Sequence, residues 1–76
     1  MKHRSFIEVL PSNNGGWFYH EKSTNGKIKN ASQVYTRKSS AKRAGMREAW
    51  EQSGQCKVYD KDGHIQQIFY YNDLDV

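Results

Sequence analysis

The sequence predicts an α+β domain with the element order β-β-β-α-β-β, in which an antiparallel sheet carries one helix packed on one face. Three observations predict it. Alternating strand formers turn once at an Asn-Gly and once at an Asp-Gly dipeptide, and both dipeptides are typical of β-hairpins. A block of helix formers lies between these two turns. Because 76 residues leave room for one core only, we expect a single domain over residues 1–76.

The N-terminal half of the chain predicts three strands. Residues 5–11 alternate and end at a proline, and residues 17–23 follow a Gly-rich turn. Residues 27–34 come directly after the Asn25-Gly26 turn, where a type I′ turn demands positive φ angles.

A two-residue loop at Asn25-Gly26 also predicts which side chains share a face of the sheet, because strand side chains alternate. Tyr19 opposes Ser32 in this register, and Lys22 opposes Lys29. Two like charges in that position repel each other by roughly 0.2–1 kcal/mol, and either a bound phosphate or plain solvation would relieve the repulsion. Trp17, Tyr19 and Ile28 then lie beneath the helix, and the other face collects Phe18, His20, Lys22, Lys27 and Lys29.

The C-terminal half predicts a helix and a second hairpin. Helix formers run from about residue 38 to 53, with Thr36, Ser39 or Ser40 as the N-cap and Gly54 at the end. Ala41, Gly45 and Ala49 form a stripe of small residues that permits close approach to a sheet, with Met46 and Trp50 beside it. Residues 55–71 predict two strands around the Asp62-Gly63 turn, with Cys56 and Val58 on one face. The acidic end, residues 72–76, is expected to be a loose tail.

Charge is distributed unevenly along the chain. Residues 22–47 hold eight Lys or Arg and no acidic residue, whereas the remainder holds four basic and eight acidic residues. Such a layout can steer an anionic partner toward one side, or can simply keep a small protein soluble.

The residues "GGW", "STNGKI" and the small-residue helix resemble the YegP-like family of small bacterial domains of unknown function. A related short sister group, also uncharacterised, resembles the second half at Asp62, Gly63 and Ile65. The resemblance implies a β-β-β-α unit that is often paired as a tandem repeat or dimer, in a bacterial or phage-borne protein, and it implies no function. Glu21 and Lys29 depart from it, because apolar residues are expected there. The matching positions are Gly16, Trp17, Asn25, Gly26, Ile28, Ser32, Tyr35, Lys38, Ala41, Gly45 and Met46.

Several kinds of chemistry find no support in the sequence. Three His residues and one Cys show no zinc-site spacing, and Cys56 is expected to be a small core residue rather than a nucleophile. "DKDG" at Asp60 lacks the Glu of a calcium loop and predicts a hairpin turn instead. We expect no enzyme, no cofactor and no metal. A lone cysteine, and the lack of an apolar leader or membrane-length segment, predict a cytoplasmic protein without membrane contact.

The sequence favours a non-catalytic binding domain whose partner is nucleic acid, DNA or RNA, or another anionic surface. "YTRKSS", at the expected helix N-terminus, is one place for a phosphate contact, and a plain helix cap is the alternative. Arg43 and Arg47 are expected on the far side of the helix from the sheet lysines, so one monomer cannot present both groups together. The candidate anion-binding residues are Phe18, His20, Lys22, Lys27, Lys29, Arg37, Lys38, Lys42, Arg43 and Arg47.

A second hypothesis is that the protein is a protein-interaction module, which either forms a homodimer or binds another protein as an inhibitor-type partner. It would act through strand edges and the C-terminal run Phe69, Tyr70 and Tyr71. Adjacent rings there must face both sides of a strand, which is typical of a strand covered on both faces.

Overall fold

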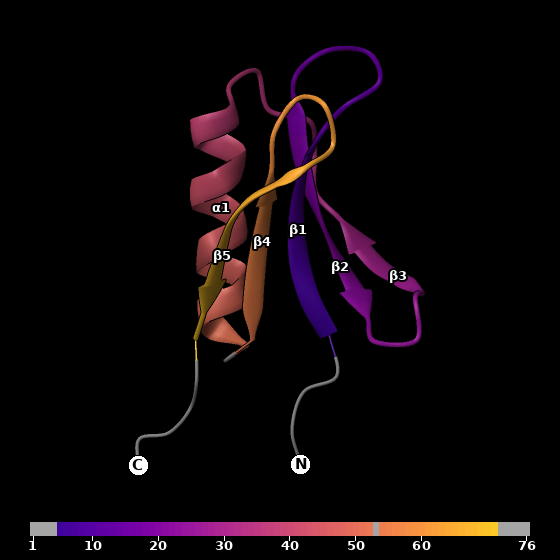
Figure 1. Cartoon of the computed structure of the whole chain (residues 1–76), viewed down its shortest axis with the longest axis vertical. Helices are drawn as coiled ribbons and strands as arrows, with labels where there is room; N and C mark the ends of the chain where they lie inside the picture. The colour runs from indigo at the N-terminus through magenta and orange to yellow at the C-terminus, as the bar shows by residue number, and fades with distance from the viewer. Residues whose placement is uncertain (1–4, 53, 72–76) are drawn as a thin grey trace.

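The part of the chain that the structure describes forms two layers, a twisted five-stranded sheet and one helix that lies against one face of it (Figure 1). This computed structural model describes residues 5–52 and 54–71, so the expected acidic tail lies outside the described residues. The α+β fold and the order β-β-β-α-β-β are confirmed. The elements are β1 (Ser5–Pro11), β2 (Trp17–Ser23), β3 (Ile28–Ala31), α1 (Lys38–Glu51), β4 (Gln55–Tyr59) and β5 (Ile65–Tyr70).

The sheet is mixed rather than wholly antiparallel. Its strand order is β3-β2-β1-β4-β5, and β1 pairs with β4 in parallel, with Ile7 opposite Cys56 and Val9 opposite Val58. The reason lies in the connection. β3 runs in the direction of β1, the helix returns along the sheet, and β4 then starts again from the same end as β1. A crossover through a helix therefore yields a parallel pair, whereas the tight hairpins yield antiparallel ones.

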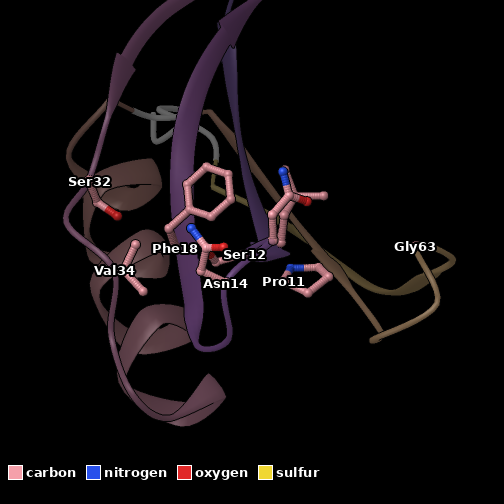
Figure 2. Close-up of a pocket in the computed structure, with 9 residues that line it drawn as sticks. Pro11, Ser12, Asn14, Phe18, Ser32, Val34 and Gly63 are labelled. Atoms are coloured by element: carbon pink, nitrogen blue, oxygen red, sulfur yellow. The ribbon is translucent and has the colours of Figure 1, made fainter.

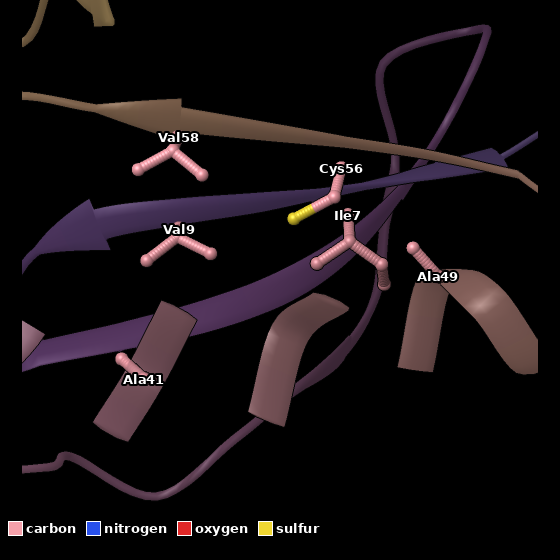
Figure 3. Packing of buried hydrophobic residues seen from close by; sticks show 6 residues of the cluster. All are labelled: Ile7, Val9, Ala41, Ala49, Cys56 and Val58. Atoms are coloured by element: carbon pink, nitrogen blue, oxygen red, sulfur yellow. The ribbon is translucent and has the colours of Figure 1, made fainter. Parts of the chain in front are cut away.

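The core lies between α1 and the three central strands (Figure 3). Ile7, Val9, Cys56 and Val58 are each fully buried, and they meet the small-residue stripe of the helix. An added Cβ at Gly45 would lie 2.9 Å from a methyl group of Val9, so the helix approaches the sheet as closely as glycine permits. The expected stripe and the expected core position of Cys56 are both confirmed.

The helix ends differ in detail from the sequence prediction. Arg37 occupies the N-cap position in an extended conformation and makes no side-chain cap hydrogen bond, so the expected capping by a Thr or Ser is wrong. The helix ends at Glu51, and the Gly54 N–H donates to the carbonyl of Ala49 at 3.0 Å. Trp50, expected beside the stripe, leaves 65% of its surface exposed.

The β2–β3 hairpin has a longer loop than the sequence predicts. Ser23 N–H donates to the Lys27 carbonyl at 2.8 Å, and Gly26, with φ of 93°, donates to the Ser23 carbonyl at 2.9 Å. This three-residue loop, a turn followed by a left-handed glycine, moves Ile28 opposite Lys22. A bulge between Glu21 and Lys22 then restores the predicted register, and Ser32 N–H donates to the Tyr19 carbonyl at 2.8 Å.

Candidate functional site

The candidate site is the sheet face opposite the helix. Strand registers place Glu8 beside His20 on one side and beside Lys57 on the other, so this carboxylate lies at the centre of the face. Alternation along the strands brings aromatic and basic side chains around it. We call this surface the open face, and it consists of Phe6, Glu8, Leu10, Phe18, His20, Lys22, Lys57 and Tyr59.

Glu8 is the hub of a polar cluster on the open face. His20 Nε2 lies 2.8 Å from Glu8 Oε1, the Tyr59 hydroxyl donates to Glu8 Oε2, and Lys22 Nζ lies 3.8 Å from Oε1. Glu8 and His20 are each only 7% exposed although they lie on the face opposite α1. The two side chains hydrogen-bond to each other, and buried charged groups are stable in a protein when they are paired in this way.

The ionisation of this cluster follows from its contacts. Burial disfavours the Glu8 carboxylate, but the hydrogen bonds from Tyr59 and His20 and the charge of Lys22 outweigh it and hold the pKa of Glu8 below its ordinary value. Burial, and then the bond to Glu8, raise the pKa of Tyr59 to about 12. Glu8 is therefore ionised at neutral pH and Tyr59 protonated. The negative charge of Glu8 is already matched by donors within the protein.

Cations and rings interleave around the polar cluster. Lys57 Nζ lies 4.2 Å from the centre of the Phe6 ring, a cation–π contact that holds the ammonium over the open face. Phe18 meets His20 edge to face, with ring centres 5.7 Å apart. Phe18 therefore keeps His20 covered while its own ring remains partly exposed.

The structure brings together Phe18, His20 and Lys22 among the predicted anion-binding residues. Lys27 lies exposed in the β2–β3 turn. The expected face-to-face pair of Lys22 and Lys29 is wrong, because the bulge leaves Lys29 without a partner across the strands and its ammonium lies 3.4 Å from Glu21 Oε2.

Glu21 accounts for one departure from the family pattern. It is only 8% exposed, and it accepts hydrogen bonds from Ser5 at 2.9 Å and Asn30 at 3.2 Å. A polar residue is stable there because the neighbouring strands supply donors, with Lys29 as a partly exposed counter-charge.

Two basic residues of the helix cover rings rather than face solvent. Lys38 Nζ lies 4.9 Å from the Trp17 ring centre and donates to the Gln66 side chain, and Lys42 Nζ lies 5.6 Å from the ring centre of Phe69. Their charges lie at the junction of the helix and the sheet. They do not extend the open face.

The remaining basic residues of the predicted set are Arg37 at the helix N-cap and two arginines farther along the helix. Arg43 and Arg47 are exposed on α1, and the ion pairs among residues 5–52 and 54–71 do not include them. Since α1 lies on the face opposite the Glu8 cluster, Arg43 and Arg47 are separated from Lys22 as expected, whereas Lys29, paired with Glu21, does not join Lys22 on the open face.

Sequence reasoning missed five residues of the site: Phe6, Glu8, Leu10, Lys57 and Tyr59. Alternation in residues 5–11 was a usable signal for Phe6, Glu8 and Leu10. Lys57 and Tyr59 gave no such signal, because their place depends on the pairing of β4 with β1, two strands more than 40 residues apart in sequence.

The turn at Asp60 is the hairpin turn that the sequence predicts. One Asp60 side-chain oxygen accepts from the N–H groups of Asp62 and His64, each at 2.9 Å. The side chains of Asp60, Asp62 and His64 also place possible metal-ligand atoms within 4.8 Å of one another. Closing the turn accounts for the position of the Asp60 carboxylate without an ion.

No protein-family model, curated protein or solved structure matches the chain. The resemblance to the YegP-like family therefore stays a prediction. Among the described residues, the helix is neither long enough nor apolar enough to cross a membrane.

Proposed function

We propose that this protein is a non-catalytic domain that binds single-stranded nucleic acid, DNA or RNA, on the open face. One observation carries the proposal: partly exposed rings and lysines from three neighbouring strands share a face whose single carboxylate is already paired inside the protein. Lys22 lies 3.8 Å from the ionised Glu8, so the charges of these two groups offset each other, and Lys57 gives the surface a net positive charge toward a phosphate.

The mode of binding follows from the geometry of a sheet. Bases of an unpaired strand stack on exposed rings, and every base has a π face, so stacking tolerates sequence. Phe18 is the stacking ring in this proposal, and Lys22 and Lys57 contact backbone phosphates. Phe6 holds Lys57 in place through the 4.2 Å cation–π contact. The basic residues of the helix are left out of the contact, because they lie on the opposite face.

Fluorescence anisotropy of labelled single-stranded oligonucleotides over a series of salt concentrations tests the electrostatic part. For single strands the slope of log Kobs against log salt changes by about 0.7 for each phosphate contact. Replacing both lysines in a Lys22→Gln/Lys57→Gln variant should therefore reduce the slope by about 1.4. The matched control, Arg43→Gln/Arg47→Gln, removes the same charge from the helix and should leave the slope as it is. An effect of the helix variant alone would move the site to α1.

Stacking is tested by Phe18→Ala and Phe18→Leu. Loss of one stacked base costs about 1–3 kcal/mol, so Phe18→Ala should weaken binding roughly 5- to 150-fold. Phe18→Leu retains apolar volume and should lose most of the same affinity, because leucine has no π face. Thermal melts of both variants show whether the fold survives. Wild-type affinity in a folded Phe18→Leu variant would contradict the stacking role.

A cytoplasmic setting belongs to the same proposal. Nucleic acid is present there, and the lone, buried Cys56 fits a reducing compartment.

The β5 edge favours a second candidate function, association with another protein by strand addition. β5 has no charged residue and no proline, and Ile65, Ile68 and Tyr70 are 50%, 39% and 64% exposed. Native edge strands are usually protected by charge, proline or a bulge. β5 lacks the first two, and the register shift at Val58 and Tyr59 lies at its start, so the regular stretch of residues 67–70 supports strand addition. Phe69 and Tyr71 pack toward the core instead, so within the described residues the strand is covered on one face only.

Sedimentation velocity over a range of protein concentrations tests this candidate. A second copy added at β5 gives a dimer that Ile68→Pro abolishes, because the register with β4 points the Ile68 N–H away from β4, toward the free edge, and proline removes that donor. A monomer at every concentration leaves β5 without a self-association role.

A further inference from the structure

An open cavity of about 470 Å³ lies at one end of the open face (Figure 2). Three connections meet around it: the β1–β2 turn, the segment after β3, and the β4–β5 turn at Gly63. Phe18 belongs to both the open face and the cavity wall, so the cavity continues the proposed binding surface. Its volume falls within the range of about 300–1,000 Å³ that is typical of small-molecule sites.

The cavity is held open by backbone contacts. Ser12 N–H donates to the Gly16 carbonyl at 2.9 Å and closes the β1–β2 turn. Trp17 and Tyr35 exchange two backbone hydrogen bonds of 2.8 and 2.6 Å, which fix the segment after β3 against β2. An added Cβ at Gly16 would lie 2.6 Å from the Tyr35 carbonyl oxygen, so this approach requires glycine. The walls are therefore formed before any ligand arrives.

The lining combines one aromatic ring with two amides. Phe18, Leu10, Pro11 and Val34 supply the apolar surface. The exposed side chains of Asn13 and Asn14 supply amide groups, and within residues 5–52 and 54–71 no hydrogen bond engages either of them.

The hydroxyl of Ser32 is committed elsewhere. Ser32 Oγ accepts from the Tyr19 N–H at 3.0 Å and donates to the Gln33 carbonyl at 2.7 Å. Within the part of the chain that the structure describes, the amides of Asn13 and Asn14 and the hydroxyl of Ser12 are therefore the lining side chains without a hydrogen bond, and of these the amides offer both a donor and an acceptor in fixed positions on one planar group.

We infer that this cavity holds one unpaired nucleobase of the bound strand, stacked on Phe18 and recognised by the amides of Asn13 and Asn14. Side-chain amides supply both a donor and an acceptor, which match the edge of a base. The Phe18 ring stacks on any base, so the choice among bases depends on the hydrogen bonds of the two amides. The inference rests on the proposed function and adds base selectivity to it.

The test compares the affinities of the wild-type protein for dA6, dC6, dG6 and dT6, and for the corresponding RNA hexamers, by anisotropy. We expect the best and worst bases to differ roughly fivefold or more, as an amide that recognises a base edge implies. An Asn13→Ala/Asn14→Ala variant should bind all bases within about twofold of one another while keeping its salt dependence. Gln67→Ala, which removes an exposed amide of β5 outside the cavity, is the matched control and should keep the preference.

The outcomes separate the two proposals. Equal wild-type affinity for all bases overturns the base subsite and leaves the open-face proposal standing. A preference that survives in the double variant also overturns the subsite. Absence of wild-type binding to every hexamer at low salt overturns the open-face proposal, and the subsite falls with it.

Discussion

Replacing Glu8 by Gln removes the charge at the centre of the open face and keeps the size of the side chain. Glu8 accepts from both His20 and Tyr59, and an amide offers only one oxygen in place of two. A hydrogen bond to a charged group contributes about 1.5–3 kcal/mol, and the site is buried, so we expect the free energy of unfolding at pH 7 to fall by about that amount. In a domain of this size each kcal/mol lowers Tm by about 4–8 °C.

The pH dependence gives this prediction its direction. The pKa of Glu8 is lower in the folded protein than its ordinary value of 4.5, so the ionised carboxylate stabilises the fold above that pH. The stabilisation disappears as the pH falls through the folded pKa. Wild-type protein and the Gln variant should therefore differ at pH 7 and converge as the pH falls below 4.5 and through the folded pKa, because protonated Glu8 resembles an amide.

Urea unfolding followed by circular dichroism, at pH 7 and at a series of pH values below 4.5, measures the difference. Glu51→Gln, at an exposed position of the helix, is the matched control and should change stability by less than about 0.5 kcal/mol. Equal stability of wild type and Glu8→Gln at pH 7, or a deficit that stays constant throughout the acidic series, would refute the assignment of Glu8 as an ionised hub.

Three further changes test the packing and the cluster. Gly45→Ala places a Cβ 2.9 Å from Val9. The cost of overpacking, about 1–3 kcal/mol, should exceed the gain in helix propensity of about 1 kcal/mol, so the variant should be less stable. An unchanged or higher urea midpoint would contradict this. Ile7→Ala leaves a cavity at a fully buried position and should lower the free energy of unfolding by about 2–5 kcal/mol, measured as a lower Tm. A small shift in Tm would mean that neighbouring side chains fill the cavity. Tyr59→Phe should be less stable than wild type at neutral pH. The pKa of Tyr59 is raised from 10.0 to about 12 in the folded protein, so the protonated hydroxyl contributes its full stabilisation of the fold below pH 10. The stabilities of wild type and Tyr59→Phe should therefore converge between pH 10 and 12. A constant difference over that range would argue against the hydrogen bond to Glu8.

The candidate site was predictable only in part. Phe18, His20 and Lys22 alternate along one strand, so their common face follows from the two-residue period of the backbone. Lys29 was misplaced because loop length fixes hairpin register, and Asn-Gly suits more than one loop: Gly26 serves here as the left-handed residue of a three-residue turn. A one-residue shift in the pairing of β2 with β3, followed by a bulge, places the Lys29 ammonium beside the Glu21 carboxylate.

The strands and the helix of this protein follow from local properties of the chain, namely periodicity, turn dipeptides and the Ala41-Gly45-Ala49 stripe. The parallel pairing of β4 with β1 is not a local property, since it depends on how the helix crosses the sheet. That pairing places Lys57 and Tyr59 beside Glu8 and so assembles the open face. Local patterns set which way a side chain points, and the packing of distant segments decides what it meets.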